Sequence, residues 1–162
     1  MNKRKIKFRA WNKVWGMMSL VDKIEFEEGK PVSVSVTIKA TDFDHTDEWS
    51  DYEVGDDIIL QQFTGLKDVN GVEIYEGDII LYPDTESEFI DVGIGGEGVK
   101  VAETGINSFF PVEFKDGEFG INVNLNSEIL YNGWYTLRMA LEEVESIEVI
   151  GNIYENPELL KV

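Results

Sequence analysis

Apolar and polar residues alternate along much of the chain, and this is the period of a β-strand. The alternation begins at residues 6–11, and residues 15–21 predict a second strand after a turn at Asn12 and Lys13. It is clearest over residues 32–39, where every second residue is valine or isoleucine. These patterns predict an N-terminal β-hairpin followed by a third strand.

The second half of the chain has the same β pattern, interrupted by short turns. Asn70-Gly71 and Asp116-Gly117 are dipeptides that tolerate the positive φ angles of tight hairpin turns. Residues 84–98 are acidic and rich in glycine, which predicts a mobile loop. Strands are expected at residues 58–63, 72–82, 109–114, 118–123 and 147–154.

One segment has the period of an amphipathic helix instead. Residues 137–144 place leucine, alanine and valine on one helical face, and Thr136 is a favourable N-cap. A last short turn is expected after Asn156, as its cap, and Pro157, as its first helical residue. Many short strands with one helix predict a mainly β protein, built as a small barrel or roll.

Charge divides the chain. The sequence has 162 residues, 14 of them basic and 32 acidic, so its formal net charge is −18. Residues 1–15 hold six basic residues and no acidic one, whereas residues 42–57 hold eight acidic residues and no basic one. The acidic stretch has no period and predicts a loop. The sequence therefore favours an N-terminal β region at residues 1–57 and a barrel or roll at residues 58–162.

The acidic charge also limits the partners. Binding to duplex nucleic acid depends on cationic side chains that displace counterions, and anionic membranes attract basic patches. The sequence therefore predicts no direct nucleic-acid binding and no membrane binding, and it favours a basic host or phage protein as partner. It has no cysteine, which excludes disulfides and thiolate metal sites.

Motifs for catalysis or cofactor binding are weak. Gly93, Gly95 and Gly98 have the spacing of a dinucleotide-binding motif, but β-prone residues follow where that motif needs a helix. His45 is the only histidine, so the sequence predicts neither a two-histidine metal site nor a catalytic triad. We expect a protein without enzymatic activity and without a cofactor.

Residues 42–53 partly match a calcium-binding loop. Their oxygen-bearing side chains fall at positions 1, 3, 5, 9 and 12 of such a loop, but position 6 is Asp47 where the turn requires glycine. A weak cation site is one interpretation, and a solvated acidic loop is the other. The candidate ligands are Asp42, Asp44, Thr46, Ser50 and Glu53.

Three stretches, at residues 6–12, 62–80 and 147–160, resemble the YopX family of phage and prophage proteins. The resemblance implies an SH3-like barrel or roll with an N-terminal β-hairpin region and one short C-terminal helix. It also implies self-association, and it supplies no catalytic residues. Gly65 and Gly77 are expected to adopt backbone angles that other residues resist. The residues expected to determine the fold are Phe8, Arg9, Trp11, Thr64, Gly65, Asn70, Gly71, Tyr75, Gly77, Asp78, Gly151, Asn152, Asn156 and Pro157.

Three hypotheses for function follow. The first is a phage accessory protein in the host cytoplasm, a binding or assembly module that forms a homo-oligomer. Its basic N-terminal hairpin would meet acidic surface of a neighbouring copy or of its own chain. The second is an inhibitor whose acidic residues at 42–57 and 84–103 imitate a phosphate backbone. The third is a hydrolase that uses a pair of carboxylates.

Overall fold

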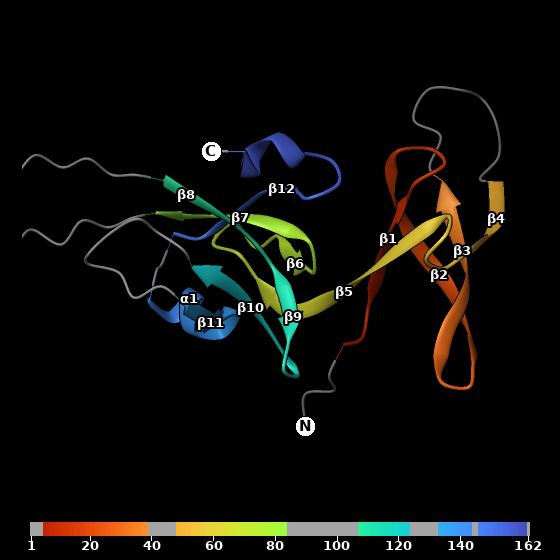
Figure 1. Ribbon diagram of the computed structural model, residues 1–162, viewed down its shortest axis with the longest axis horizontal. Coiled ribbons are helices and arrows are strands. Elements are labelled where there is room, and N and C mark those ends of the chain that lie inside the picture. Colours follow the sequence, from red (N-terminus) through yellow and green to blue (C-terminus); the bar gives the residue numbers. More distant parts are fainter. Residues whose placement is uncertain (1–4, 39–47, 84–106, 124–132, 144–145, 162) are drawn as a thin grey trace, which may run out of the picture.

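The computed structural model describes residues 5–38, 48–83, 107–123, 133–143 and 146–161. They form three antiparallel sheets with one short α-helix and one 3-10 helix, arranged as two lobes along the long axis of the molecule (Figure 1). The prediction of a mainly β protein is confirmed. The described strands do not close into the single SH3-like barrel that the family resemblance implies, because they divide among three separate sheets.

The N-terminal lobe is formed by part of a six-stranded sheet. The strand order of this sheet is β4-β3-β2-β1-β5-β6. The predicted hairpin is present, since β1 and β2 pair from Arg9 opposite Leu20 to Asn12 opposite Met17. The third predicted strand is β3. The six strands are β1 (Phe8–Asn12), β2 (Met17–Glu27), β3 (Lys30–Ile38), β4 (Glu48–Glu53), β5 (Ile58–Lys67) and β6 (Glu73–Tyr75).

Part of the acidic stretch 42–57 is a strand, so the prediction of a loop is wrong there. β4 pairs with β3 from Glu53 opposite Ser33 to Glu48 opposite Ile38. Backbone hydrogen bonds to β3 order this segment. Such bonds do not require apolar and polar residues to alternate, so the sequence of β4 lacks the strand pattern. β4 is also an edge strand, where acidic residues discourage pairing with further strands. Residues 42–47 lie outside the described residues.

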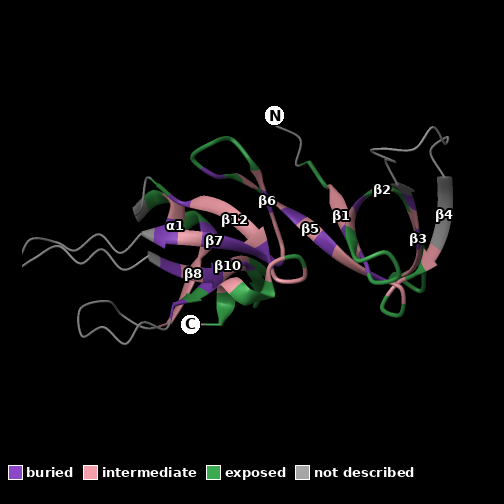
Figure 2. Cartoon of the chain, turned by 90° about the horizontal axis from the view of Figure 1, so that it is seen from above, coloured by how far each residue is buried: buried purple, intermediate pink, exposed green. Residues whose placement is uncertain are grey.

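The sheet of the N-terminal lobe curls around a small apolar core. Ala10, Val34, Val36 and Ile58 are each fully buried, and side chains such as Tyr52 pack against them. The two edges of the curl approach each other where Val54 forms an isolated bridge with Ile58. This core is separate from the larger one in the other lobe (Figure 2).

Two polar side chains in this lobe are buried with an atom that has no hydrogen-bond partner in the described structure. The Oδ1 atom of Asn12 accepts bonds from the N–H groups of Val14 and Trp15, at 3.0 and 3.1 Å, which shapes the β1–β2 turn. Its Nδ2 atom has no partner, and neither has the Oγ atom of Ser19. A buried hydroxyl without a partner lowers stability.

We therefore expect Ser19→Ala to raise the free energy of unfolding by about 1 kcal/mol, because it removes the unpaired hydroxyl. Asn12→Ala is the matched comparison in the same lobe. It should lower stability, because it removes the two bonds that hold the turn. Urea unfolding of both variants measures the difference, and a loss of stability in Ser19→Ala would contradict the expectation.

The C-terminal lobe contains two three-stranded sheets. Their strands are β7 (Asp78–Pro83), β8 (Asn107–Pro111) and β12 (Glu148–Asn152) in one sheet, and β9 (Glu113–Lys115), β10 (Glu118–Val123) and β11 (Gly133–Thr136) in the other. The predicted turn at Asp116-Gly117 joins β9 to β10, with φ angles of 53° and 89°. The core between the sheets comprises Ile74, Ile80, Tyr82, Phe110, Val112, Ile121, Val123, Leu137, Ala140 and Ile147.

The helix α1 (Leu137–Glu143) lies where the sequence predicts it, and it buries Leu137 and Ala140 in this core. The predicted N-cap is confirmed, because the Oγ1 atom of Thr136 accepts a bond from the N–H of Met139 at 3.3 Å. Across the described ranges, no helix combines the length and apolar character needed to cross a membrane.

The strand β5 belongs to both lobes. Its first half pairs with β1, from Ile58 to Gln62, and its second half pairs with β6 (Figure 1). The ladder shifts between Phe63 and Lys67, where Gly65 has a φ of +88°. The expected division of the chain after residue 57 stays a prediction, and β5 carries the chain across it.

Candidate functional site

A buried polar cluster joins the two lobes, and we call it the joint. It consists of Arg9 from β1, Gln61 from β5, Asp78 from β7 and Asn152 from β12. The last three residues are each 1% exposed. The chain brings these residues together because β5 pairs with β1, whereas β7 and β12 pair with each other.

Every polar atom of the Asp78 carboxylate is engaged. Its Oδ1 atom accepts bonds from Arg9 Nη2 and from Asn152 Nδ2, the latter at 3.3 Å. Its Oδ2 atom accepts a bond from the N–H of Tyr75 at 2.8 Å. Gln61 completes the joint, because its Oε1 atom accepts a bond from Arg9 Nε at 2.8 Å and its amide pairs with that of Asn152. Such a fully bonded network is favourable inside a protein, where a single missing partner is costly.

Two glycines make room for the joint. A Cβ atom on Gly77 would lie 2.5 Å from Gln61 Nε2, and its φ of +78° also favours glycine. A Cβ atom on Gly151 would lie 2.6 Å from the Oδ1 atom of Asn156. That oxygen accepts a bond from the N–H of Asn152 at 3.3 Å. The two glycines therefore let backbone and polar side chains approach closely.

Asn156 occupies the predicted N-cap position of the last helix, but its side chain makes no capping bond. The 3-10 helix η1 (Pro157–Leu160) begins at proline as predicted, but the side chain of Asn156 donates or accepts no bond there. It faces back to the N–H of Asn152 instead. The bond from the Asn156 side chain to the joint stabilises the fold, because a buried backbone N–H without a partner lowers stability.

A second polar contact lies beside the joint. Lys7 Nζ donates to both carboxylate oxygens of Glu73, and the hydroxyl of Tyr75 donates to Glu73 Oε2 at 3.0 Å. These bonds lower the pKa of Glu73 and raise that of Lys7, with the hydrogen bond between them as the main cause in both. Burial, followed by the bond to Glu73, raises the pKa of Tyr75. The basic strand thus meets acidic residues of its own chain at this point.

Aromatic contacts strengthen the same region. The guanidinium carbon of Arg9 lies 4.6 Å from the centre of the Tyr75 ring, in a cation–π arrangement. Trp11 stacks on Tyr154, with ring centres 5.9 Å apart and an angle of 15° between the planes. These contacts connect β1, near the N-terminus, with Tyr75 in the middle of the sequence and with Tyr154 near the C-terminus.

Other residues of the predicted signature lie farther from the joint. The hydroxyl of Thr64 donates to the carbonyl of Ile74 at 2.8 Å, beside Gly65. A turn lies at the predicted place, but it runs from Asp68 to Gly71, where the N–H of Gly71 donates to the carbonyl of Asp68 at 3.0 Å, and within the Asn70-Gly71 pair only Gly71 has a positive φ, of +80°. Phe8 is half-buried in β1. These residues shape β5 and the segment that leads to β6.

Two polar residues that order this region are absent from the predicted signature. Gln61 is one, and its signal is a polar residue directly after the apolar run at residues 58–60. Asp68 is the other, and it begins the Asn70-Gly71 turn. Its carboxylate accepts bonds from two N–H groups of that turn and from the N–H of Val149 in β12 at 3.0 Å.

An open groove of about 540 Å³ lies next to the joint, between the two lobes. One wall is β5 from Ile59 to Gln61, and the opposite wall is the corner between β8 and β9. The C-terminal segment closes one end with Tyr154 and Leu160. The full lining is Ile59, Leu60, Gln61, Glu76, Gly77, Pro111, Val112, Glu113, Phe114, Ile153, Tyr154 and Leu160.

The groove combines apolar walls with negative charge. Phe114 and Leu160 are 52% and 38% exposed, so both offer apolar surface at the groove. Glu76 and Glu113 are its only charged lining residues, and neither has an ion-pair partner in the described part of the chain. Burial raises the pKa of Glu76, and a backbone hydrogen bond at Gln62 partly opposes this shift. A cation placed in the groove would relieve the cost of that half-buried carboxylate.

Several candidate residues fall outside the described ranges. Among the candidate calcium ligands, Asp42, Asp44 and Thr46 lie there, whereas Ser50 and Glu53 belong to β4. The glycines of residues 93–98, His45 and the acidic stretch 84–103 also lie outside. The described residues include no group of three or more histidine, cysteine, aspartate and glutamate side chains that could hold a metal ion.

These features define a mainly β protein of two lobes, with a shared strand, a buried polar joint and an open acidic groove. The chain belongs to the YopX protein family, whose family model matches residues 7–161. It is also similar to protein EF1440 from Enterococcus faecalis, known from a crystal structure, with 25% sequence identity and a TM-score of 0.60. That match covers 98% of this chain and 99% of the other, so it includes both lobes. No curated protein matches the chain.

Proposed function

We propose that this protein is a non-enzymatic binding and assembly module that acts in the host cytoplasm and holds an extended basic segment of a protein in the groove between its lobes. The observation that carries the proposal is the half-buried carboxylate of Glu76 among apolar walls, without a cation beside it in the described structure. A lysine or arginine side chain from a partner supplies that cation. The adjacent apolar residues of the partner pack on Phe114 and Leu160.

The joint supports the proposal because it makes the groove a preformed site. Gln61 and Gly77 belong both to the groove lining and to the joint or its immediate packing. The two walls are therefore held at a fixed separation before any partner arrives. A preformed site loses less conformational entropy on binding than a mobile one.

The carboxylates favour binding over catalysis. Asp78, the most buried of them here, has both oxygens hydrogen-bonded to Arg9, Asn152 and the N–H of Tyr75, and it is 1% exposed, so its place in the fold is structural. Glu76 and Glu113 line an open groove beside apolar residues, and apolar walls suit the packing of a partner's side chains.

Selection from a library of displayed peptides tests the proposal. We expect the enriched peptides to combine lysine or arginine with apolar residues, and to bind Phe114→Ser/Leu160→Ser at least about tenfold more weakly, since that change removes about 1.4 kcal/mol or more. Both side chains are exposed, so this variant should fold normally.

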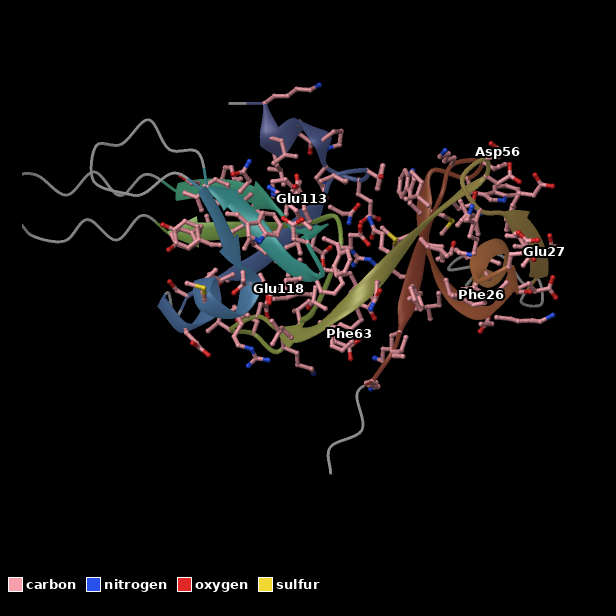
Figure 3. The ribbon with its side chains drawn as sticks, turned by 60° about the horizontal axis from the view of Figure 1, so that its bottom comes forward. Phe26, Glu27, Asp56, Phe63, Glu113 and Glu118 are labelled. Carbon is pink, nitrogen blue, oxygen red and sulfur yellow. The ribbon has the colours of Figure 1, made fainter. Side chains whose placement is uncertain are left out.

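Phe26→Ser is the matched control. Phe26 is 58% exposed at the far end of the N-terminal lobe, and Figure 3 shows it well away from Glu113. Peptides should bind this control as they bind the wild type. Equal binding to the groove variant would contradict the proposal, and so would a selection that enriches no peptide.

A further inference from the structure

The N-terminal segment of the chain has the chemistry that the groove lacks. Residues 1–7 contain Lys3, Arg4, Lys5 and Lys7 and no acidic residue, within a chain of net charge −18. The side chain of Lys5 is 66% exposed, and Ile6 is 67% exposed. The basic side chains of this segment are complementary in charge to the two carboxylates of the groove, and the exposed Ile6 is complementary to its apolar walls.

This segment leads away from the groove of its own chain. β1 runs antiparallel to β5, with Phe8 opposite Gln62 and Asn12 opposite Ile58. The groove is lined by Ile59, Leu60 and Gln61, which lie opposite the later residues of β1. The chain before Phe8 continues past Phe63 instead, where the N–H of Phe63 donates to the carbonyl of Lys7 at 2.9 Å.

Contacts within the chain hold that direction. Glu73 binds Lys7 through both carboxylate oxygens, at 2.5 and 2.6 Å, and so fixes the start of β1 on the side of β6. Lys5, which is described and lies before Lys7, approaches Glu73 only at 4.0 Å. Six extended residues reach about 20 Å, which is enough to enter a neighbouring molecule.

We infer that residues 1–6 of one copy dock in the groove of a second copy, with their lysine and arginine side chains beside Glu76 and Glu113 and with Ile6 against Phe114 and Leu160. This inference rests on the proposed function, because it names the occupant of the same groove. Attraction between the +6 charge of residues 1–15 and the acidic remainder of the partner adds to the contact.

Such a contact is heterologous, because it joins a segment of one copy to a different surface of the next. If two copies exchange segments, the interface as a whole becomes isologous and closes as a dimer, and otherwise the heterologous contact builds rings or filaments. Either arrangement makes the association depend on salt, since part of the attraction is between exposed charges.

A charge exchange tests the inference in the full chain. The segment variant is Lys3→Glu/Arg4→Glu/Lys5→Glu, and the groove variant is Glu76→Lys/Glu113→Lys. Sedimentation at about 50 mM salt, where exposed charges are weakly screened, should show each variant associating with itself at least tenfold more weakly than the wild type. A mixture of the two variants should regain association, because each then meets a segment of opposite charge.

Two further variants keep the result interpretable. Glu27→Lys/Asp56→Lys makes the same charge change on exposed residues of the N-terminal lobe, far from Glu113 (Figure 3), and should associate like the wild type. Glu76→Gln/Glu113→Gln removes the charges with nearly the same side-chain shape, in case Glu76→Lys disturbs folding. It should also weaken association.

The outcomes separate the inference from the proposed function. A wild type that stays monomeric at every concentration overturns the inference, as does a mixture that regains nothing. Association that is lost in Trp15→Ser, with the exposed indole of the β1–β2 turn removed, but kept in both charge variants overturns it too. If displayed peptides still bind the groove in any of these cases, the proposed function stands and only the occupant is wrong.

Discussion

Replacing Asp78 with alanine is expected to lower the free energy of unfolding by about 3–5 kcal/mol, the typical cost of removing one partner from a buried ion pair. Asp78 is 1% exposed and the side chain of Arg9 is 18% exposed, so water cannot compensate the guanidinium that remains. The change also leaves the N–H of Tyr75 without its acceptor, and it removes one of the two bonds that the Asn152 amide donates. Urea unfolding followed by circular dichroism measures the loss.

The exposed pair of Lys23 and Glu25 is the control for this prediction. Their side chains are 64% and 53% exposed, and exposed ion pairs contribute little to stability. Glu25→Ala should therefore leave the unfolding midpoint close to that of the wild type. If Asp78→Ala unfolded at the same urea concentration as Glu25→Ala, the joint would not be the energetic connection between the lobes.

The second large effect is expected for Gly77→Ala, with a loss of about 2–4 kcal/mol from two separate causes. A left-handed backbone costs a residue with a Cβ atom about 1–2 kcal/mol, and the φ of Gly77 is +78°. The new Cβ atom would also lie 2.5 Å from Gln61 Nε2, so the amide must move and weaken its bonds to Asn152. Thermal and urea unfolding both measure this loss.

Gly71→Ala separates the two causes. Its φ is +80°, nearly the same as that of Gly77, but no heavy atom lies within 4 Å of its Cβ position. It should therefore lose only the backbone term, about 1–2 kcal/mol. Equal losses in the two variants would show that the close approach to Gln61 costs nothing, and that the joint tolerates a displaced amide.

Sequence patterns predicted the elements whose side chains alternate between the core and the surface. Residues 32–39 alternate because one side of β3 faces the core of the N-terminal lobe, where Val34 and Val36 are fully buried. Residues 137–143 have a helical period because α1 buries Leu137 and Ala140. β4 has no such signal in its sequence, and it is ordered by its hydrogen bonds to β3 together with Tyr52, which packs against the core.

The joint and the groove could not be predicted in the same way. Gln61 and Asn152 are separated by 91 positions, and each is an ordinary polar residue until the fold brings the two amides together. The family resemblance drew attention to Arg9, Asp78 and Asn152 without showing that they meet. The groove is lined by residues from separate stretches of the chain, so no local pattern could reveal it.

The position of Asn152 near the end of the chain has a consequence for synthesis. Arg9, Gln61 and Asp78 leave the ribosome before Asn152, so the arginine–aspartate pair cannot have all its hydrogen-bonding partners until β12 has emerged. Domains fold largely as units during synthesis, and this contact between distant positions is completed only once β12 is available. A product truncated before β12 lacks this partner as well as Tyr154 and Leu160, so it has no complete groove.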